Sequence, residues 1–311
     1  MPRPIIIDTD PGQDDAVALL LALAAPEELD VRGITTVAGN VPLELTTRNA
    51  LMMVELAGRP DIAVYAGCDR PMVRDLITAE YVHGKTGIDG ADTPPPRTTP
   101  ADQHAVEFII ETCRATPGIT LCTLGPLTNM GTALEQAPDI AGTIAQLVLM
   151  GGGFFEGGNT TPAAEFNIYV DPQAAALVFG SGIDLVMMPL DVTHRALTSD
   201  ARVDAFRDLG TASGAAVAGM LEFFERYDME RYGTEGAPLH DPTVIAYLLE
   251  PGIFDGRRCR VDIETASELT MGMTVVDWWG LTTDEPNCFV VHQIDDERFF
   301  ALLTERIGLL P

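Results

Sequence analysis

Four aspartates stand within eight positions near the start of the chain, in the stretch DTDPGQDD at residues 8–15. They follow a run of three isoleucines, which is typical of a buried strand. Crowded carboxylates repel one another, and their pKa values rise unless a cation neutralises them. Because the charged candidate ligands are all carboxylates, the sequence predicts a site for a hard cation, Ca²⁺ or Mg²⁺ rather than Zn²⁺.

The turn in this stretch brings acids from two elements to one point. Asp10 follows the predicted strand, and Pro11-Gly12 makes the turn. Asp14 and Asp15 then fall on the first turn of the next helix, where the helix dipole favours negative charge. A purely structural alternative uses Asp8 or Asp10 as the helix N-cap. The stretch carries more acid than capping requires, so we expect a metal site.

A further acid stands late in the chain, where His240-Asp241-Pro242 precedes a helical pattern. Asp241 alone is an ordinary N-cap with Pro242 at the first helical position, and His240 alone is more often a structural histidine. Beside a metal site, the two together predict a fourth carboxylate ligand with a titratable group next to it.

The glycine-rich segment 151–175 follows a predicted strand, yet it matches neither GxGxxG leading into a helix nor GxxxxGK[ST]. It does carry Asn159, Glu165 and Asn167. Amides and a carboxylate that converge suit a polyhydroxylated ligand, because each buried hydroxyl needs a hydrogen-bond partner. The alternative, that these residues make only local turns, stays open.

Short, continuously apolar runs alternate with helical patterns over the first 190 residues. This alternation predicts βαβ units and a mainly parallel sheet whose strands are buried on both faces. In such sheets ligands bind outside the carboxyl ends of the strands, where the acidic stretch falls. We expect strands at 4–8, 31–39, 62–67, 119–125, 144–152 and 183–191, and helices at 14–29, 42–58, 103–115, 126–138 and 171–182.

The rest of the chain changes character. It is helical from about 199 to 250, β-rich at 258–280 and 287–295, and ends with a helix at 296–308. We therefore expect one domain over residues 1–311. Its fold class is α/β, an open, mainly parallel sheet flanked by helices with a Rossmann-like core and a helical and β-rich C-terminal part.

Composition limits the environment and the partners. The net charge of −27 over 311 residues argues against nucleic acid or an anionic membrane surface as a partner. The first apolar run is too short for a secretory signal, and no run reaches the roughly 18 residues that span a bilayer. The five cysteines lack CxxC spacing, as in reduced cytoplasmic proteins. We expect a cytoplasmic protein without membrane or nucleic-acid partners.

Six motifs follow one another along the chain: DTDPGQDD (8–15), VAGN (37–40), VHGKTGIDG (82–90), LGPLTN (124–129), GNTTPAAEFNIYVDPQAA (158–175) and LHDP (239–242). Together they resemble the nucleoside hydrolases of the inosine–uridine-preferring type. The similarity runs from residue 4 to about 300. It implies the nucleoside hydrolase fold, hydrolysis of ribonucleosides to ribose and free base, and a role in purine and pyrimidine salvage.

The resemblance also implies roles for single residues. A Ca²⁺ would be held by Asp10, Asp15, Asp241 and the backbone carbonyl of Leu124. Asp10 would act as the base on a calcium-bound water, and His240 would protonate the leaving base. A homodimer or homotetramer is the implied assembly, with a small-molecule ribonucleoside as substrate. The implied substrate-binding residues are Asp14, Asn40, His83, Met150, Asn159, Glu165, Phe166, Asn167, Tyr227 and Tyr232. Asp8 is expected to be a structural hydrogen-bond acceptor.

Two other classes stay open. A haloacid-dehalogenase-like phosphatase also begins with an apolar strand and Asp-x-Asp, but it needs a downstream lysine, and Lys85 is the only lysine in the chain. A non-catalytic nucleoside- or calcium-binding protein could share the scaffold, although the intact Asp10, Asn167 and His240 count against it.

The segment 258–280 departs from the family pattern at Ala266-Ser267 and Met271, so the sequence does not predict which base is preferred. Trp278 and Trp279 lie in the same segment. We expect them to be core or subunit-contact residues.

Overall fold

A mostly parallel sheet forms the centre of the computed structural model, which describes residues 1–232 and 236–311, with side chains described outside 225–235. The described strands pair in the order β3-β2-β1-β4-β5-β6-β9-β7-β8. Pairing is parallel from β3 through β9, whereas β7 runs antiparallel to both β9 and β8. The strands are β1 (Arg3–Thr9), β2 (Leu29–Thr36), β3 (Val64–Ala66), β4 (Ile119–Thr123), β5 (Ile144–Met150), β6 (Leu185–Met188), β7 (Phe254–Ile263), β8 (Thr274–Asp277) and β9 (Cys288–Ile294).

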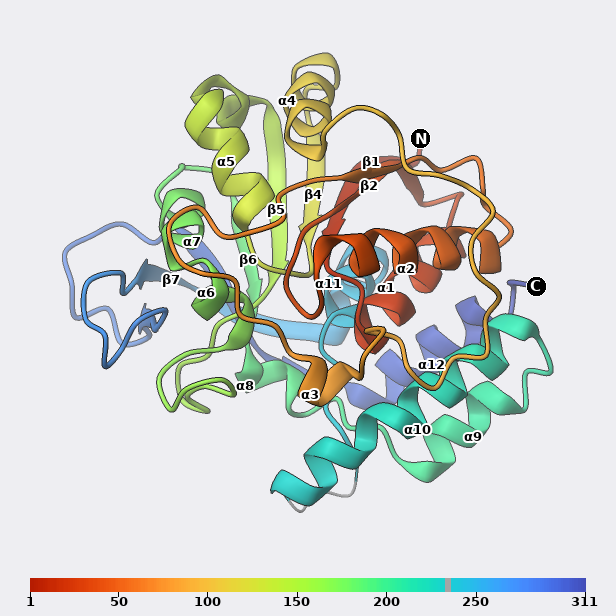
Figure 1. The fold of residues 1–311 in the computed structure, drawn as a ribbon. Helices are drawn as coiled ribbons and strands as arrows, with labels where there is room; N and C mark the ends of the chain where they lie inside the picture. The colour runs from red at the N-terminus through yellow and green to blue at the C-terminus, as the bar shows by residue number, and fades with distance from the viewer. Residues whose placement is uncertain (233–235) are drawn as a thin grey trace.

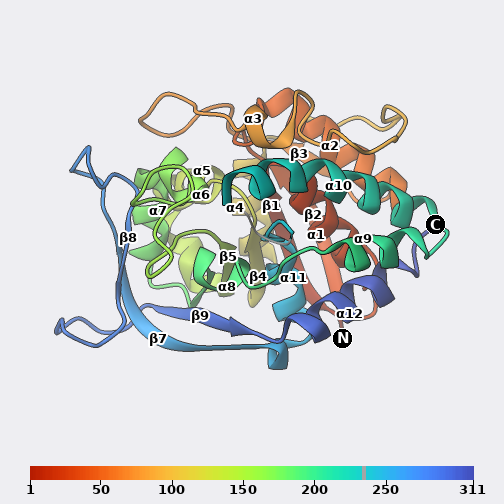
Figure 2. The same cartoon turned by 90° about the horizontal axis from the view of Figure 1, so that it is seen from below.

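Helices cover both faces of the sheet (Figure 1). One face packs against α1 (Gln13–Leu23), α2 (Leu43–Leu56), α9 (Asp200–Arg207), α10 (Ala212–Tyr232), α11 (Pro242–Leu249) and α12 (Asp296–Ile307). The other face packs against α4 (Ala105–Ala115), α5 (Thr128–Gln136) and α7 (Pro172–Phe179). Seen from below, β7 and β9 lie along the edge of the molecule, away from α2 and α3 (Glu80–His83) (Figure 2). The expected fold class is confirmed.

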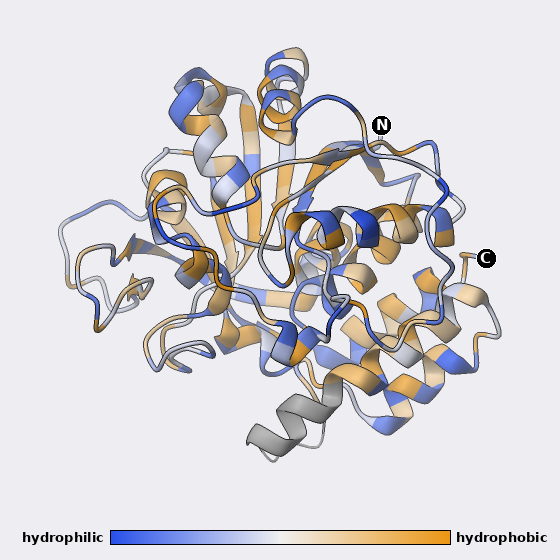
Figure 3. Ribbon diagram, viewed as in Figure 1, coloured by the Kyte–Doolittle hydropathy of each residue, from blue (hydrophilic) through white to orange (hydrophobic). Residues whose placement is uncertain are grey.

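The continuously apolar strands supply both cores. Ile5 and Ile7 of β1 belong to the core that includes α1, whereas Ile6 belongs to the core that includes α4. Successive side chains of a strand point to opposite faces, so a strand covered on both sides must be apolar at every position. The strands in the middle of the sheet are accordingly mostly hydrophobic in Figure 3. Every residue of α1 is buried as well, because this helix lies between the sheet and other helices.

Several predicted boundaries were wrong. The strand predicted at 183–191 ends at Met188, because Pro189 has no N–H to donate to the sheet and α8 (Leu190–Thr193) follows at once. The strand predicted at 31–39 ends at Thr36. Short elements were not predicted at all, including α3, α6 (Phe166–Val170) and the 3₁₀ turns η1 (Pro138–Thr143) and η2 (Pro251–Ile253).

The carboxyl ends of β1, β2, β4 and β5 meet at one edge of the sheet, since these strands run in parallel. The segments that follow them carry the candidate site residues. No helix in the described part of the chain has both the length and the apolar character that crossing a bilayer requires.

Candidate active site

The acidic turn between β1 and α1 is closed by its own last aspartate. Gly12, rather than Asp8 or Asp10, is the N-cap of α1. Asp15 accepts the backbone N–H of Gly12 at 2.9 Å through Oδ2, and it accepts the hydroxyl of Thr9 at 2.5 Å through Oδ1. The capping alternative for Asp8 and Asp10 is therefore wrong, and Asp10 is left for another role.

Asp10 lies in a tight cradle. Its Oδ2 accepts the backbone N–H of Asn40 at 2.7 Å, whereas its buried Oδ1 has no hydrogen-bond partner among the described residues. A Cβ added at Gly39 or Gly125 would come within 2.1 Å of an Asp10 oxygen, so both positions must stay glycine. Burial, and next the charge of Asp15, raise the pKa of Asp10 well above its usual range.

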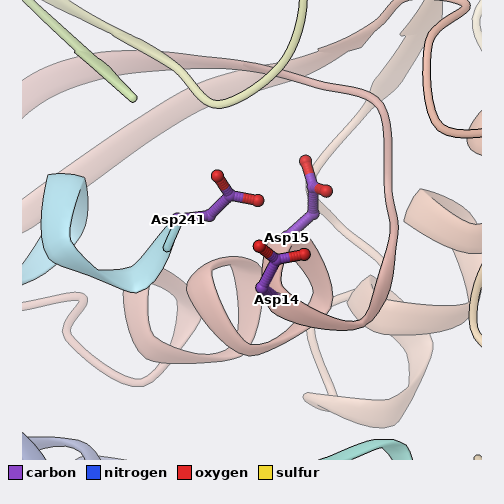
Figure 4. Close-up of side chains that lie close together, drawn as sticks. All are labelled: Asp14, Asp15 and Asp241. Carbon is purple, nitrogen blue, oxygen red and sulfur yellow. The ribbon is translucent and has the colours of Figure 1, made fainter. Parts of the chain in front are cut away.

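Three other buried carboxylates form a candidate metal centre. Ligand oxygens of Asp14, Asp15 and Asp241 all lie within 4.8 Å of one another, with Asp14 and Asp15 on α1 and Asp241 beside the start of α11 (Figure 4). Asp241 occupies the N-cap position of α11, with Pro242 first in the helix as predicted, but its side chain makes no capping hydrogen bond. Burial, followed by the charges of the other aspartates, raises the pKa of Asp241 well above normal.

This donor set fits a hard divalent cation. Buried carboxylates that repel one another, all offering oxygen, are relieved most directly by an ion such as Ca²⁺ or Mg²⁺. The grouping differs in one respect from the expectation, because Asp14 rather than Asp10 completes the close trio. The Leu124 carbonyl, the expected fourth ligand, accepts the side-chain amide of Asn167 at 2.7 Å.

Most of the predicted site residues line one pocket beside this trio. Including its open mouth, the pocket measures about 630 Å³, a usual size for a small-molecule site. The side chains of Tyr227 and Tyr232 lie outside the described residues. The predicted residues that line the pocket are Asp14, Asn40, His83, Leu124, Met150, Asn159, Glu165, Phe166, Asn167, His240 and Asp241.

One wall of the pocket is built around the start of α6. Glu165 is the N-cap of this helix, and its carboxylate accepts the backbone N–H groups of Gly152, Asn167 and Ile168. Burial raises the pKa of Glu165 to about 7. Asn159 accepts the backbone N–H of Phe166 at 2.9 Å. Local turns and a ligand-binding wall thus use the same residues, so the two interpretations made from the sequence are compatible.

The loop that carries this wall is anchored by residues that the sequence analysis missed. Asp191 accepts three backbone N–H groups, from residues 154, 155 and 156, at 2.8–3.1 Å. The Thr274 hydroxyl of β8 donates to the Gly153 carbonyl at 2.6 Å and accepts the Gly153 N–H at 2.9 Å. The indole of Trp278 stacks on Phe154. Asp191 follows a strand end, which was its only signal in the sequence.

Two histidines lie in the pocket wall. His83 contacts Gln13 through Nδ1, and Nδ1 of His240 lies 2.7 Å from the Thr193 hydroxyl. Burial lowers the pKa of His83 to about 3, and burial, followed by the charges of His194 and His83, lowers the pKa of His240 to about 3. Both rings are therefore neutral near pH 7. Tyr81, Val82 and Phe224 also line the pocket and were not predicted. Val82 begins the motif at 82–90, Tyr81 directly precedes it, and Phe224 stands in the region predicted to be helical.

The remaining acid of the first motif lies beneath the site. Asp8 accepts the hydroxyl of Thr35 at 2.6 Å and the side-chain amide of Asn129 at 2.7 Å. Burial raises its pKa to about 6. The contacts are those expected of a structural acceptor. Of the two tryptophans, Trp278 is core and Trp279 is 71% exposed.

Comparison of the chain with known proteins assigns it to a family of enzymes. The family model for inosine-uridine preferring nucleoside hydrolases matches residues 5–301. The chain is 48% identical to the pyrimidine-specific ribonucleoside hydrolase RihA of Salmonella paratyphi B, with 99% of each chain covered. It is 54% identical, with the same coverage, to an uncharacterised protein of Schizosaccharomyces pombe. A purine-preferring ribonucleoside hydrolase from Gardnerella vaginalis has a similar structure, with a TM-score of 0.92, 32% identity and 98% of each chain covered.

Proposed function

The chain belongs to the inosine-uridine preferring nucleoside hydrolase family and hydrolyses the N-glycosidic bond of ribonucleosides, and from this premise we propose which of its residues carry the reaction. Asp10 is the base that takes the proton of the attacking water, and His240 is the acid for the leaving base. Asp10, Asp15 and Asp241, with the Leu124 carbonyl, hold Ca²⁺. The family assignment contradicts the phosphatase alternative, and the similarity to ribonucleoside hydrolases over 98–99% of the chain favours an enzyme over the non-catalytic alternative.

One observation carries the assignment of Asp10. Its Oδ1 is buried and has no hydrogen-bond partner among the described residues, and the charges of Asp15 and Asp14 repel its carboxylate. The N–H of Asn40 fixes the other oxygen, so the free one has a defined direction. A Ca²⁺ bound beside it would lower the pKa of a water and hold ribose hydroxyls.

The substrate hydroxyls find their partners on two sides of the pocket. We propose that Asp14 of α1 and Asn40, which follows β2, bind the ribose from one side. Asn159, Glu165 and Asn167 bind it from the other side, which is formed by the loop after β5 and by α6. Met150, Phe166 and His83 complete the walls. Because Glu165 and Asn159 are held by backbone N–H groups, they keep their positions without substrate.

A neutral His240 can donate a hydrogen bond into the pocket if its proton is on the nitrogen away from Thr193, but the acid role also requires that the ring gain a second proton, because a neutral imidazole does not release its N–H near pH 7. The Thr193 hydroxyl can donate to Nδ1, which leaves the N–H on Nε2. Protonated on both nitrogens, the ring would transfer its Nε2 proton to the departing base, which is a poor leaving group without it. Tyr227 and Tyr232 are proposed to contact the base as well.

We also propose a preference for pyrimidine ribonucleosides. The support is the name and similarity of one relative, since the pyrimidine-specific RihA is 48% identical over 99% of the chain, against 32% for the purine-preferring enzyme. Incubation with uridine, cytidine and inosine, followed by a reducing-sugar assay, tests this. Ribose release from inosine at a higher kcat/KM than from both pyrimidine nucleosides would contradict the preference.

The compartment, the domain organisation and the assembly of the enzyme are proposed as well. All five cysteines are free thiols, as is usual in a reducing cytoplasm. We propose a cytoplasmic enzyme of one domain, residues 1–311, that forms homodimers or homotetramers and takes part in nucleoside salvage. Light scattering of the purified protein tests the assembly, and a monomer at micromolar concentration would contradict it.

A further inference from the structure

A buried glutamine joins the acidic turn to the histidine at the opposite wall of the pocket. Gln13 is the first residue of α1 and is fully buried. Its Nε2 donates to the backbone carbonyl of His83 at 3.0 Å and to that of Asp89 at 3.2 Å. Its Oε1 lies 2.8 Å from Nδ1 of the His83 ring. Both the NH₂ group and the oxygen of its amide therefore bind residues of the segment 83–89.

The chemistry of these contacts fixes the orientation of the amide. Backbone carbonyls only accept hydrogen bonds, so the NH₂ group of Gln13 must face them. The opposite orientation would place three oxygens against one another without a proton between them. The group facing Nδ1 is consequently the amide oxygen, which also only accepts. Nδ1 of His83 must then be the donor.

We infer that His83 carries its proton on Nδ1 and presents Nε2 to the substrate as a hydrogen-bond acceptor, with Gln13 as the positioning residue that sets this tautomer. The ring lines the pocket. Nε2 has no hydrogen-bond partner among the residues whose side chains are described, while Phe224 stacks on the ring with centroids 5.6 Å apart. A Cβ added at Gly12 would come within 2.5 Å of Nδ1, so the ring lies directly on the turn.

Burial supports the same state, because it lowers the pKa of His83 to about 3 and keeps the ring neutral at pH 7. A neutral ring with its proton on Nδ1 has only a lone pair on Nε2. Such a nitrogen recognises a hydroxyl or N–H donor of the nucleoside, and it cannot protonate the leaving base. This part rests on the proposed function, because it leaves the acid role to His240.

The tautomer can be read without any substrate. In protein labelled with ¹⁵N-histidine, long-range ¹H–¹⁵N spectra distinguish a protonated Nδ1 from a protonated Nε2, and His83→Gln identifies the signals. We expect Nδ1–H in the wild type. Gln13→Met, which keeps the length and removes the amide, is expected to release the ring to a mixture containing Nε2–H. A wild-type ring protonated on Nε2 would overturn the inference.

A second buried amide provides the matched control. Asn49 donates to the carbonyls of Pro11 and Thr86, so it joins the same two segments without touching His83. Asn49→Ala is therefore expected to leave the tautomer on Nδ1. If Asn49→Ala changes the tautomer as much as Gln13→Met does, general loosening of the segments explains the effect and Gln13 has no special role.

Substrate analogues then identify the donor. We compare kcat/KM for uridine, 5′-deoxyuridine and 3-methyluridine in the wild type and in His83→Ala. The analogue that lacks the donor should lose about three- to tenfold in the wild type and nothing further in His83→Ala, as expected for one neutral hydrogen bond. For each analogue, the loss of kcat/KM caused by the analogue and the loss caused by His83→Ala could instead be independent, so that the two factors multiply. If this holds for both analogues, Nε2 contacts neither donor and the acceptor role fails. If no nucleoside is hydrolysed, the proposed function fails, while the tautomer measurement still stands.

Discussion

The carboxylate of Asp10 accepts the backbone N–H of Asn40 at 2.7 Å through Oδ2, while its Oδ1 lies buried without a hydrogen-bond partner among the described residues. One oxygen is thus fixed, and the other is directed but unused within the chain. A buried acceptor left in this state costs free energy, about 1–3 kcal/mol. A bound cation or water would satisfy this oxygen, which is why the first prediction concerns Asp10.

Replacing Asp10 removes the proposed base and one proposed ligand. Asp10→Ala is expected to lower kcat for uridine by at least about a hundredfold, the smaller end of the usual contribution of general base catalysis. Asp10→Asn keeps the shape and the contact with Asn40, and it should lose a similar factor. Steady-state kinetics with a circular dichroism check of folding provide the measurement. Near-normal turnover in folded Asp10→Ala would refute both roles.

His240 should matter in proportion to how poor the leaving group is. His240→Ala is expected to reduce hydrolysis of uridine or inosine by about a hundredfold or more, and to affect p-nitrophenyl riboside far less, because nitrophenolate leaves without an acid. Thr193→Val removes the hydroxyl that faces Nδ1 and should show the same selectivity in weaker form. Equal losses on natural and activated substrates would argue against acid catalysis by His240.

The metal-free protein should become less stable as the pH rises. Burial raises the pKa of Asp8 from 3.8 to about 6 and that of Glu165 from 4.5 to about 7. Between the ordinary and the raised values the folded state binds more protons than the unfolded state, so the free energy of unfolding falls as pH increases. We expect a lower Tm at pH 8 than at pH 5 in the presence of EDTA.

Measurements of Tm at the same two pH values also test whether the protein binds Ca²⁺. Ca²⁺ should raise Tm more at pH 8 than at pH 5, because protons compete for the aspartates. Glu165→Gln lacks one of the titrating groups and should show a smaller pH dependence than the wild type. A metal-free protein that is more stable at pH 8 would show that the buried acids do not dominate the pH dependence.

Asp191 should act on substrate binding through the loop that it holds. Asp191→Asn keeps one acceptor oxygen where the carboxylate serves three backbone N–H groups. We expect KM to rise by roughly fivefold or more with a smaller change in kcat, and stability to fall by about 1–3 kcal/mol. Urea unfolding and uridine kinetics measure the two effects.

A matched control exists in another loop. Asp277 accepts two backbone N–H groups, from Leu281 and Thr282, but it is the half-buried last residue of β8 and does not line the pocket. Asp277→Asn should leave KM unchanged. Comparable KM changes in Asp191→Asn and Asp277→Asn would mean that the loop anchor has no specific effect on the site.

Much of this protein could be predicted from the sequence because its signals are local. The apolar runs of β1, β4 and β5 indicate burial on both faces wherever the partners lie, and the resulting parallel sheet places strand ends at one edge. The acids of DTDPGQDD are close in space because they are close in the chain. The motif order then identified the family.

The positions of the shorter elements could not be predicted in the same way. Pro189 ends β6 early, yet a proline one residue after an apolar run is also compatible with a longer strand or a turn. The five residues of α6 are too few for a helical periodicity to be recognised. Its start depends on Glu165, whose carboxylate accepts the N–H of Gly152 at the opposite end of the loop between β5 and α6.

Tertiary structure alone decided which polar groups meet. Asp241 reaches Asp14 and Asp15 only because α11 packs beside α1, and Gln13 reaches His83 only because the segment 83–89 folds over the acidic turn. A sequence records residue types and local periodicity, whereas a hydrogen bond or a shared cation depends on atoms within a few ångströms. Packing of distant segments fixes those distances, and it thereby sets the ligand trio and the tautomer inferred for His83.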